Sequence, residues 1–361
     1  MDQHVRMAPL RVDEAAFLRL VRGQTVGVAA RAARSALGVG AAGYGLAVAL
    51  RNAGYDRGAL TIHRAAVPVI SVGNITLGGT GKTPTVEWIA RWFRRRGVRV
   101  AILSRGYGRS AGMNDEGRVL EENLPDVPHL QAPDRVALAH AAVEELEAEV
   151  LVLDDGFQHR RLGRDLDLVL LDALDPFGLG RLFPRGLLRE PQRSLRRAGV
   201  IVLSRADLIS EADRQEIRAA AERQAGPLRW AEARHAPTDL VDSAFRSFPL
   251  GELEGRRVVG FCGIGNPEGF RRTMMTLVGD LAGFRSFPDH HAYTAADVAD
   301  LASWSAAAGA DLILTTQKDL VKLRAETLGP TPLRALRIGL EFLLGESILE
   351  TALTPLLPPG R

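Results

Sequence analysis

A glycine-rich stretch at residues 73–84, GNITLGGTGKTP, has the composition of a loop that binds phosphate groups. Its glycines allow backbone N–H groups to converge on an anion. Lys82 can reach the β- and γ-phosphates of a nucleotide, and Thr83 can offer its hydroxyl to Mg²⁺. Thr76 stands where the usual pattern of this loop has a glycine, so the sequence predicts a nucleotide site in an altered form. The residues expected to line it are Asn74, Thr76, Gly78, Gly79, Thr80, Gly81, Lys82, Thr83 and Pro84.

Two adjacent aspartates, Asp154 and Asp155, follow an apolar run in LVLDDGFQH at residues 151–159. The carboxyl end of a strand is the place where open α/β sheets bind their ligands. A phosphate loop needs a carboxylate of this kind to complete its metal site. We expect metal coordination and positioning from this pair, and the sequence leaves open which aspartate contacts the ion.

Four further stretches are denser in functional residue types than a loop requires: SRGYG (104–108), NDEG (114–117), RGLLREP (185–191) and FPDHHAY (287–293). Arg105 falls at the end of a predicted strand, and Asp115 and Glu116 form a carboxylate pair. His290 and His291 are adjacent, but no cysteine or third histidine lies at a matching spacing. A zinc site is therefore not expected there.

Short β-branched apolar runs alternate with amphipathic stretches from Val67 onward, which predicts an α/β sheet of parallel strands with Rossmann-like winding. The strands expected in the first series are 67–72, 98–104, 149–155, 166–172 and 199–204, with helices at 84–96 and 134–147. A second series, at 256–264, 284–287 and 311–316, predicts a smaller α/β lobe. Prolines and glycines at 225–255 place the boundary between them. The expected units are an N-terminal segment (1–65), a phosphate-loop core (66–225) and a C-terminal lobe (226–361).

The N-terminal segment is basic, although the whole chain of 361 residues has a formal charge of only +3. Residues 1–65 contain nine arginines against four acidic residues, a net charge of +5. This charge predicts an anionic partner such as a phospholipid surface. Nucleic acid is not expected, because stacking aromatics are not interleaved with the basic residues. The single cysteine, Cys262, predicts a reducing compartment, and we expect no secretory signal.

An uncharged run at residues 35–50 lies between Arg34 and Arg51. As a helix it would be about 24 Å long, which is shorter than a hydrocarbon core of about 30 Å. An interfacial or re-entrant membrane helix is one interpretation. A glycine-rich helix packed on the body of the protein is the other.

Lysine is rare in this chain: of 46 basic residues, only Lys82, Lys318 and Lys322 are lysines. Arginine cannot replace lysine where a compact point charge is needed, so lysines kept inside motifs suggest a function. Lys318 and Asp319 follow a predicted strand in TTQKDLVKL. Contact with the nucleotide, contact with a closing lobe and a surface ion pair are the alternatives for these two residues.

Together, seven motifs resemble in their order those of the tetraacyldisaccharide 4′-kinases of lipid A biosynthesis: VGNITLGGTGKTP, SRGYGR, DDGFQHRRL, GLLREP, FCGIGNP, FPDHHAY and TTQKDLVKL. The phosphate loop of that family is longer than the usual one, which accounts for Thr76. The resemblance implies that ATP, with Mg²⁺, phosphorylates the 4′-hydroxyl of tetraacyldisaccharide 1-phosphate to give lipid IVA. It also implies work at the cytoplasmic face of the bacterial inner membrane, with an N-terminal helix dipping into the bilayer, and we expect a monomer.

The resemblance implies roles for individual residues as well. In the family a carboxylate of a GDEP-like motif works with a histidine as the base, and these residues map to Asp115 and His290. Arg105 and Arg189 become candidates for the 1-phosphate of the substrate or for nucleotide phosphates. The expected catalytic residues are Asp115, His290, Lys82 and Asp155. The candidate metal ligands are Thr83, Asp154, Glu116 and Glu190.

Two other classes of protein fit part of the pattern. A membrane-associated regulatory P-loop NTPase, of the partition or metal-chaperone type, would hydrolyse nucleotide slowly and carry switch loops. A membrane-peripheral binding protein with a degenerate loop would show no turnover. A kinase, by contrast, requires an alcohol acceptor and a dedicated base.

Overall fold

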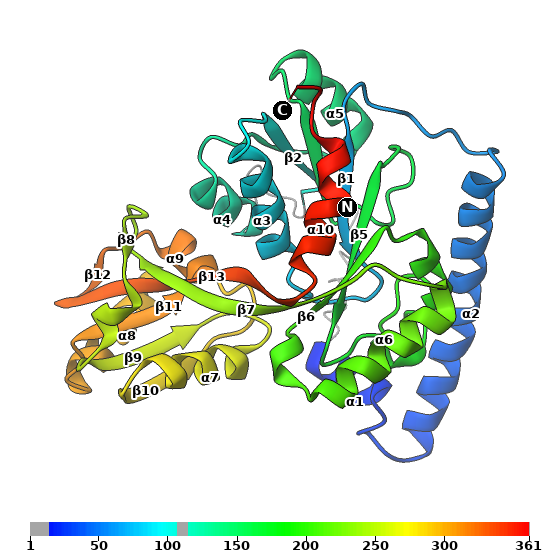
Figure 1. The fold of residues 1–361 in the computed structure, drawn as a ribbon. Helices are drawn as coiled ribbons and strands as arrows, with labels where there is room; N and C mark the ends of the chain where they lie inside the picture. The colour runs from blue at the N-terminus through cyan, green and yellow to red at the C-terminus, as the bar shows by residue number, and fades with distance from the viewer. Residues whose placement is uncertain (1–13, 107–114, 361) are drawn as a thin grey trace, which may run out of the picture.

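One continuous sheet runs through two lobes in the computed structural model, which describes residues 14–106 and 115–360 (Figure 1). Within these residues the strand order is β10-β9-β11-β13-β7-β6-β5-β1-β4-β2-β3, with β8 and β12 paired at the side. The first lobe holds the parallel half of the sheet from β6 to β3, and its centre is β1. The predicted α/β fold with a second, smaller α/β lobe is confirmed.

The strands of the first lobe form because continuous apolar runs can be buried on both faces of a parallel sheet. Every residue of β1 and β4 is buried, as predicted from VPVISV and EVLVLDD. These strands are β1 (Val69–Asn74), β2 (Val100–Ser104), β3 (His129–Gln131), β4 (Val150–Asp154), β5 (Leu166–Asp172) and β6 (Val200–Ser204). Their helices are α3 (Lys82–Arg94), α4 (Asp115–Asn123), α5 (Arg135–Glu144) and α6 (Glu211–Ala225). Short 3₁₀ turns are η1 (Gly178–Gly180), η2 (Gln192–Arg197) and η3 (Ala206–Leu208).

The second lobe, at the left of Figure 1, has its own two core clusters. Its strands are β8 (Ser247–Phe248), β9 (Arg257–Cys262), β10 (Asp280–Ser286), β11 (Leu312–Thr316) and β12 (Thr327–Leu328). Its helices are η4 (Leu250–Leu253), α7 (Pro267–Leu277), α8 (Ala295–Ala307) and α9 (Gln317–Leu323). The capping box of Thr294 and Asp297 fixes the start of α8, and Thr316 caps α9.

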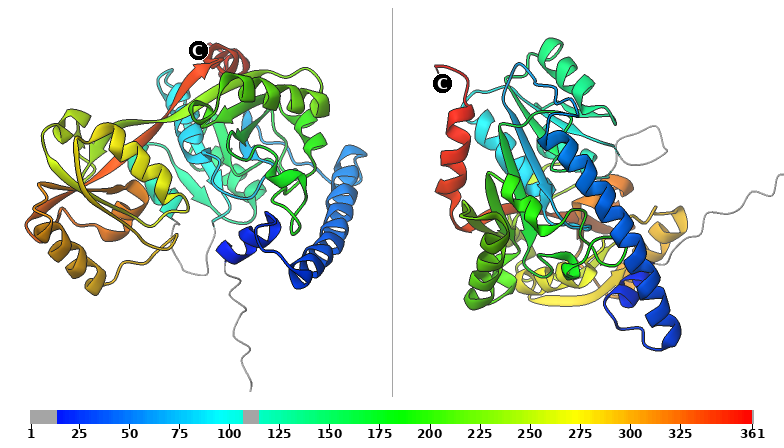
Figure 2. Two further views of the ribbon diagram at one scale, coloured as in Figure 1. Left: turned by 90° about the horizontal axis from the view of Figure 1, so that it is seen from below. Right: turned by 90° about the vertical axis from the view of Figure 1, so that its right-hand side faces the viewer.

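Two long strands, β7 (Trp230–Val241) and β13 (Thr331–Leu344), cross from one lobe to the other (Figure 2). β7 begins parallel to β6 in the first lobe and continues antiparallel to β13 into the second. After β13 the chain returns, and α10 (Glu346–Leu353) and η5 (Thr354–Leu356) lie against the first lobe, where Leu349 and Leu353 join the core of the phosphate-loop helix. The predicted boundary at 225–255 is therefore corrected: part of it is a lobe-spanning strand, and both ends of the 226–361 unit belong to the first lobe.

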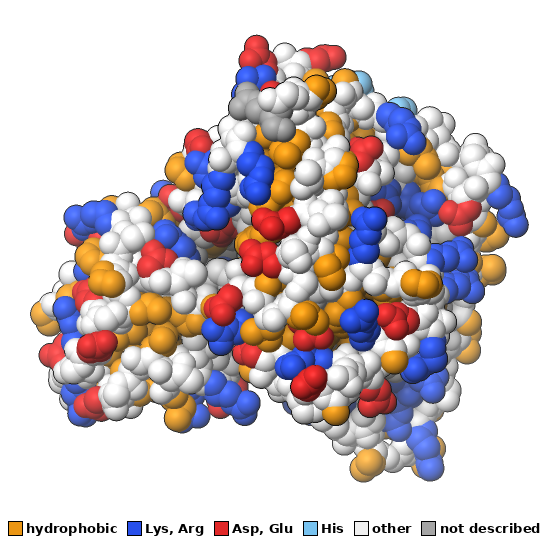
Figure 3. Space-filling model, viewed as in Figure 1, with side chains coloured by type: hydrophobic (Ala, Val, Ile, Leu, Met, Phe, Trp, Pro, Cys, Tyr) orange, Lys and Arg blue, Asp and Glu red, His pale blue; other side chains and the backbone are white. Residues whose placement is uncertain are grey.

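The N-terminal segment forms α1 (Glu14–Val21) and α2 (Val28–Asp56), and α2 is far longer than the predicted run at 35–50. Only Ala30, Ala41 and Val48 of α2 are buried, while side chains such as Val39 and Leu46 are 76% and 62% exposed. Among the described residues, α2 is the one helix long and apolar enough to cross a membrane by length and composition. Basic side chains gather over this edge of the molecule, at the right of Figure 3. An apolar helix with a basic surround is confirmed.

Candidate active site

The phosphate loop leaves the centre of the sheet at Asn74 and ends where α3 begins at Lys82. Gly78 and Gly81 have φ angles of 110° and 86°, which are disfavoured for residues with a Cβ atom. Thr76 is buried and forms an antiparallel bridge with Leu188, a residue of the loop that precedes Glu190. Thr76 has no positive φ angle, so its backbone conformation does not require a glycine at this position.

Three charged side chains meet at the mouth of the loop. Nζ of Lys82 lies 3.7 Å from Oδ1 of Asp155, in the turn that follows β4. Arg189 donates hydrogen bonds to both oxygens of the same carboxylate, at 2.6 and 3.1 Å, and another to Oδ1 of Asn74 at 3.3 Å. Burial raises the pKa of Asp155, but Lys82 and Arg189 outweigh burial and hold that pKa below its usual range. Asp155 therefore stays ionised and holds Lys82 and Arg189 together beside the loop.

Asp154 lies one residue earlier, at the end of β4, where it is paired in register with Val72 of β1. The side chain of Asp154 is buried. Thr83, the other predicted metal ligand of the loop, lies in the first turn of α3. The Thr80 hydroxyl is buried without a hydrogen-bond partner among the described residues, as expected for a group that contacts a ligand. The described residues contain no cluster of three or more His, Cys, Asp or Glu side chains that could hold a metal alone. Thr83 and Asp154 stay the predicted ligands of a Mg²⁺ site that nucleotide phosphates would complete.

Arg205 contacts the loop from the other side, and the sequence analysis missed it. It follows β6 with φ of 55° and forms a bidentate ion pair with Asp172, at the end of β5. Its Nη2 atom also donates a hydrogen bond to the carbonyl of Gly79 at 3.2 Å. Arg205 directly follows the predicted strand at 199–204, so the strand-end argument that selected Asp154 could have found it as well.

His235 of β7 is the second missed residue, and it packs on the last glycine of the loop. A Cβ atom added at Gly81 would lie only 2.2 Å from Nε2 of His235. That nitrogen is buried and has no hydrogen-bond partner among the described residues. Burial, with a smaller contribution from Arg205, lowers the pKa of His235 to about 4. No sequence signal could have found His235, because β7 was read as an interdomain stretch.

The neutral state of His235 predicts a loss of stability in mild acid. Its pKa in the folded protein is below the ordinary value of 6.5, so the unfolded chain binds a proton more readily. The resulting stabilisation is complete above pH 6.5 and is lost as the pH falls toward 4, by about 3 kcal/mol. In urea titrations from pH 7 to pH 4.5, the free energy of unfolding should fall less steeply for His235→Asn than for the native chain. The exposed His140 provides the control, and equal slopes for His235→Asn and His140→Asn would contradict this account.

His290 and His291 have different surroundings in the second lobe. The His291 ring stacks on Phe287 at 4.8 Å and its Nε2 lies 3.1 Å from the helix-capping carboxylate of Asp297. His290 has φ of 57°, its side chain is 65% exposed, and its Nε2 is 3.9 Å from Asp289. His291 therefore supports the loop, and His290 is the histidine whose ring is presented to solvent. This arrangement favours His290 as the reactive one.

The remaining predicted residues near the crevice are less fully described. Asp115 is the first residue of α4, and Glu116 follows it, but their side chains lie outside the described residues, as does the segment 107–114. Arg105 directly follows β2 and is exposed. Its proposed contact with a phosphate, like the roles of Asp115 and Glu116, stays a prediction. Asp319 is fully buried, so the alternative of a surface ion pair with Lys318 is wrong for this carboxylate.

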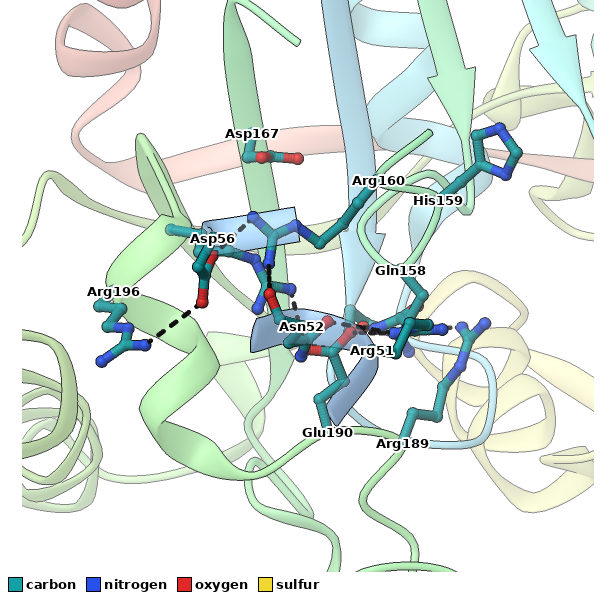
Figure 4. Close-up of polar contacts among 12 residues, drawn as sticks. Arg51, Asn52, Asp56, Gln158, His159, Arg160, Asp167, Arg189, Glu190 and Arg196 are labelled. Carbon is teal, nitrogen blue, oxygen red and sulfur yellow. Dashed lines mark hydrogen bonds and ion pairs between the residues drawn. The ribbon is translucent and has the colours of Figure 1, made fainter. Parts of the chain in front are cut away.

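The prediction that Glu190 binds metal is corrected by the structure. Glu190 is completely buried, and Figure 4 shows it beside Arg51 and Asn52 of α2. Its two oxygens accept hydrogen bonds from Arg51 at 3.1 Å, Asn52 at 3.0 Å and Arg197 at 2.9 Å. A carboxylate held by two guanidinium groups has an ion-pairing role and is not directed at the phosphate loop. Glu190 contacts α2, and the preceding residue, Arg189, contacts Asp155. These two adjacent residues therefore connect α2 to the nucleotide site.

The fold and the site define a P-loop NTPase-like protein with the loop, basic residues and acidic strand end of a nucleotide-dependent phosphotransferase. The model of the family described as tetraacyldisaccharide-1-P 4′-kinase matches residues 33–357. The chain belongs to this family.

Individual relatives agree with this assignment over most of their length. The tetraacyldisaccharide 4′-kinase of Anaeromyxobacter dehalogenans (strain 2CP-C) is 46% identical over 328 residues, covering 85% of this chain and 86% of the relative. The enzyme of the same name from Geobacter sulfurreducens is 40% identical, covering 85% and 89%. The crystal structure of LpxK from Aquifex aeolicus in complex with ATP superposes with a TM-score of 0.73 at 32% identity, covering 90% of this chain and 99% of that one.

Proposed function

We propose that this chain transfers the γ-phosphoryl group of ATP to the 4′-hydroxyl of a tetraacyldisaccharide 1-phosphate, which gives lipid IVA in lipid A biosynthesis. The observation that carries the proposal is the junction of the phosphate loop with Asp155, Lys82 and Arg189, in a chain of this family. Lys82 and the loop N–H groups bind the β- and γ-phosphates and stabilise the charge that develops on them during transfer. Asp155 keeps the Lys82 ammonium group at the loop. Thr83 and Asp154 would hold Mg²⁺, whose charge offsets that of the phosphates when it is bound.

The acceptor hydroxyl requires a base, and we assign this role to Asp115 with His290. A carboxylate beside an imidazole can accept the hydroxyl proton as the oxygen attacks phosphorus. His290 comes from the second lobe and Asp115 from the first, so the acceptor sugar would bind between them. Arg105 follows β2 and is suited to the 1-phosphate of the substrate.

The surface around α2 supports work at a membrane, which we place at the cytoplasmic face of the bacterial inner membrane. Leu46 and Leu50 are 62% and 64% exposed on a helix of 29 residues, and arginines border it at both ends. A helix with exposed apolar side chains and arginines near its ends can bind the interface between headgroups and acyl chains. The chain would act as a peripheral monomer whose acyl substrate stays in the bilayer.

A flotation assay tests both parts of the proposal in one measurement. Vesicles that carry tetraacyldisaccharide 1-phosphate are mixed with the protein, Mg²⁺ and ATP labelled at the γ-phosphate, and are then floated through a density gradient. Protein and label should rise together with the lipid. Label that remains below as free phosphate would indicate a hydrolase, and protein that remains below would contradict the membrane role of α2.

A further inference from the structure

The first turn of α9 connects the second lobe to two helices of the first. Nε2 of Gln317 donates a hydrogen bond to Oδ1 of Asn123, the last residue of α4, at 2.9 Å. Nδ2 of Asn123 in turn donates to Oε2 of Glu87 on α3 at 2.9 Å. All three side chains are buried, so each hydrogen bond is made away from water and is costly to break. The position of α4, which begins at Asp115, is therefore fixed against both α9 and the phosphate-loop helix.

Two residues further along α9, Asp319 holds the segment that carries His290. Its Oδ2 accepts the N–H of Gly263 at 3.0 Å, and its Oδ1 accepts the hydroxyl of Tyr293 at 3.0 Å. The carbonyl of Gly263 accepts the N–H of His290 at 3.2 Å. Asp319 thus contacts Tyr293, which lies on the same loop as His290, and Gly263, which follows β9 and accepts the backbone N–H of His290.

The Asp319 carboxylate cannot easily change its orientation. It is fully buried, and Oδ2 also accepts the hydroxyl of Thr316 at 2.6 Å. Nζ of Lys322 lies 3.6 Å from Oδ1 and balances the charge. A Cβ atom at Gly263 would lie 3.1 Å from Oδ1 of Asp319, so the glycine lets the loop approach the carboxylate closely. A buried, fully bonded carboxylate of this kind makes the His290 loop rigid.

We propose that Gln317 and Asp319 are positioning residues that set the spacing between Asp115 and His290 across the boundary between the lobes. This inference rests on the assignment of Asp115 and His290 made above. It gives the TTQKDLVKL motif a role: one turn of helix orients both halves of the base, Asp115 through α4 and His290 through its loop. Neither Gln317 nor Asp319 contacts the substrate in this account.

The first test is Asp319→Asn. This substitution keeps the size of the side chain, but its amide group can no longer accept hydrogen bonds from both Gly263 and Tyr293. We expect kcat to fall by about 10–100-fold, since small misplacements of reacting groups have effects of this size, while KM for ATP stays within about twofold. In a His290→Ala background the same substitution should cause no further loss, because there is then no imidazole to position. If Asp319→Asn fails to fold, Tyr293→Phe removes one of the same hydrogen bonds with a smaller change, and the same pattern is expected.

The second test is Gln317→Leu, measured alone and together with Asp115→Ala. The loss in kcat should vanish in the Asp115→Ala background, whereas a purely structural defect would lower activity equally in both. Asp300→Asn is the matched control, because Asp300 is an exposed carboxylate of the same lobe that pairs with Arg285. It should leave kcat unchanged.

The outcomes separate the positioning role from the assignment of the base. Normal turnover by both Asp115→Ala and His290→Ala would show that the base was misassigned. Strong defects in those two variants, combined with fully additive effects of Asp319→Asn and Gln317→Leu, would overturn the positioning role alone. A raised KM for ATP with an unchanged kcat would also overturn it.

Discussion

Replacing Lys82 with alanine is expected to lower kcat for phosphoryl transfer by about 10³-fold. Lys82 is placed by the start of α3 and by the Asp155 carboxylate, 3.7 Å from its ammonium group. The substitution removes the positive charge that stabilises the transferring phosphoryl group, and it removes one of the cations that keep Asp155 ionised. Steady-state kinetics with labelled ATP measure the loss, and thermal unfolding checks that the variant is folded.

Arg95→Ala is the matched control, because it removes the same charge from the opposite end of the same helix, where the side chain is exposed. Its kcat should stay within about twofold of the native value, as expected for a surface substitution. A Lys82→Ala protein that retained more than a tenth of the native rate would show that the loop does not bind the nucleotide phosphates in the way we describe.

Asp115→Ala and His290→Ala should each lower kcat by about 10²–10⁴-fold, with little change in KM for ATP. Both groups act on the acceptor hydroxyl, so their loss affects the chemical step and leaves the phosphate loop intact. Because the two residues form one unit, the double variant should be no slower than the poorer single variant. Single-turnover kinetics separate this chemical step from product release.

Two exposed residues provide controls of the same chemical type: His140 on α5 and Asp126 after α4. His140→Ala and Asp126→Ala should keep native turnover. Additive losses in the Asp115→Ala, His290→Ala double variant would mean that the two residues act independently, and the base would then have to be reassigned.

Most of the first lobe could be predicted because its strands are continuous apolar runs. The run at 166–172 became β5 with the same bounds, and Asp134, where the predicted helix at 134–147 begins, caps α5. β7 was missed for a physical reason. Its central residues are only partly buried, since it spans two lobes and pairs with β13 there, and Pro237 interrupts its pattern. A strand that is half exposed and contains a proline has the composition of a linker.

The site shows the same limit. The phosphate loop, the Asp154–Asp155 turn and His290 could be selected from the sequence because each follows a strand or precedes a helix in a recognisable pattern. The role of Glu190 could not, because its partner Arg51 is 139 positions away and only the fold brings them together. His235 and Gly81 meet for the same reason. Residue type and spacing indicate which groups can do chemistry, but the three-dimensional contacts decide which of them are already engaged in ion pairs.

The position of the transferred phosphate tests the central claim most directly. The native protein is incubated with ATP, Mg²⁺ and tetraacyldisaccharide 1-phosphate, and the lipid product is examined by phosphorus NMR and mass spectrometry. We predict one new phosphate monoester, on the 4′-oxygen, beside the original phosphate at position 1. Release of the γ-phosphate of ATP as inorganic phosphate, or its transfer to form a diphosphate at position 1, would contradict the account.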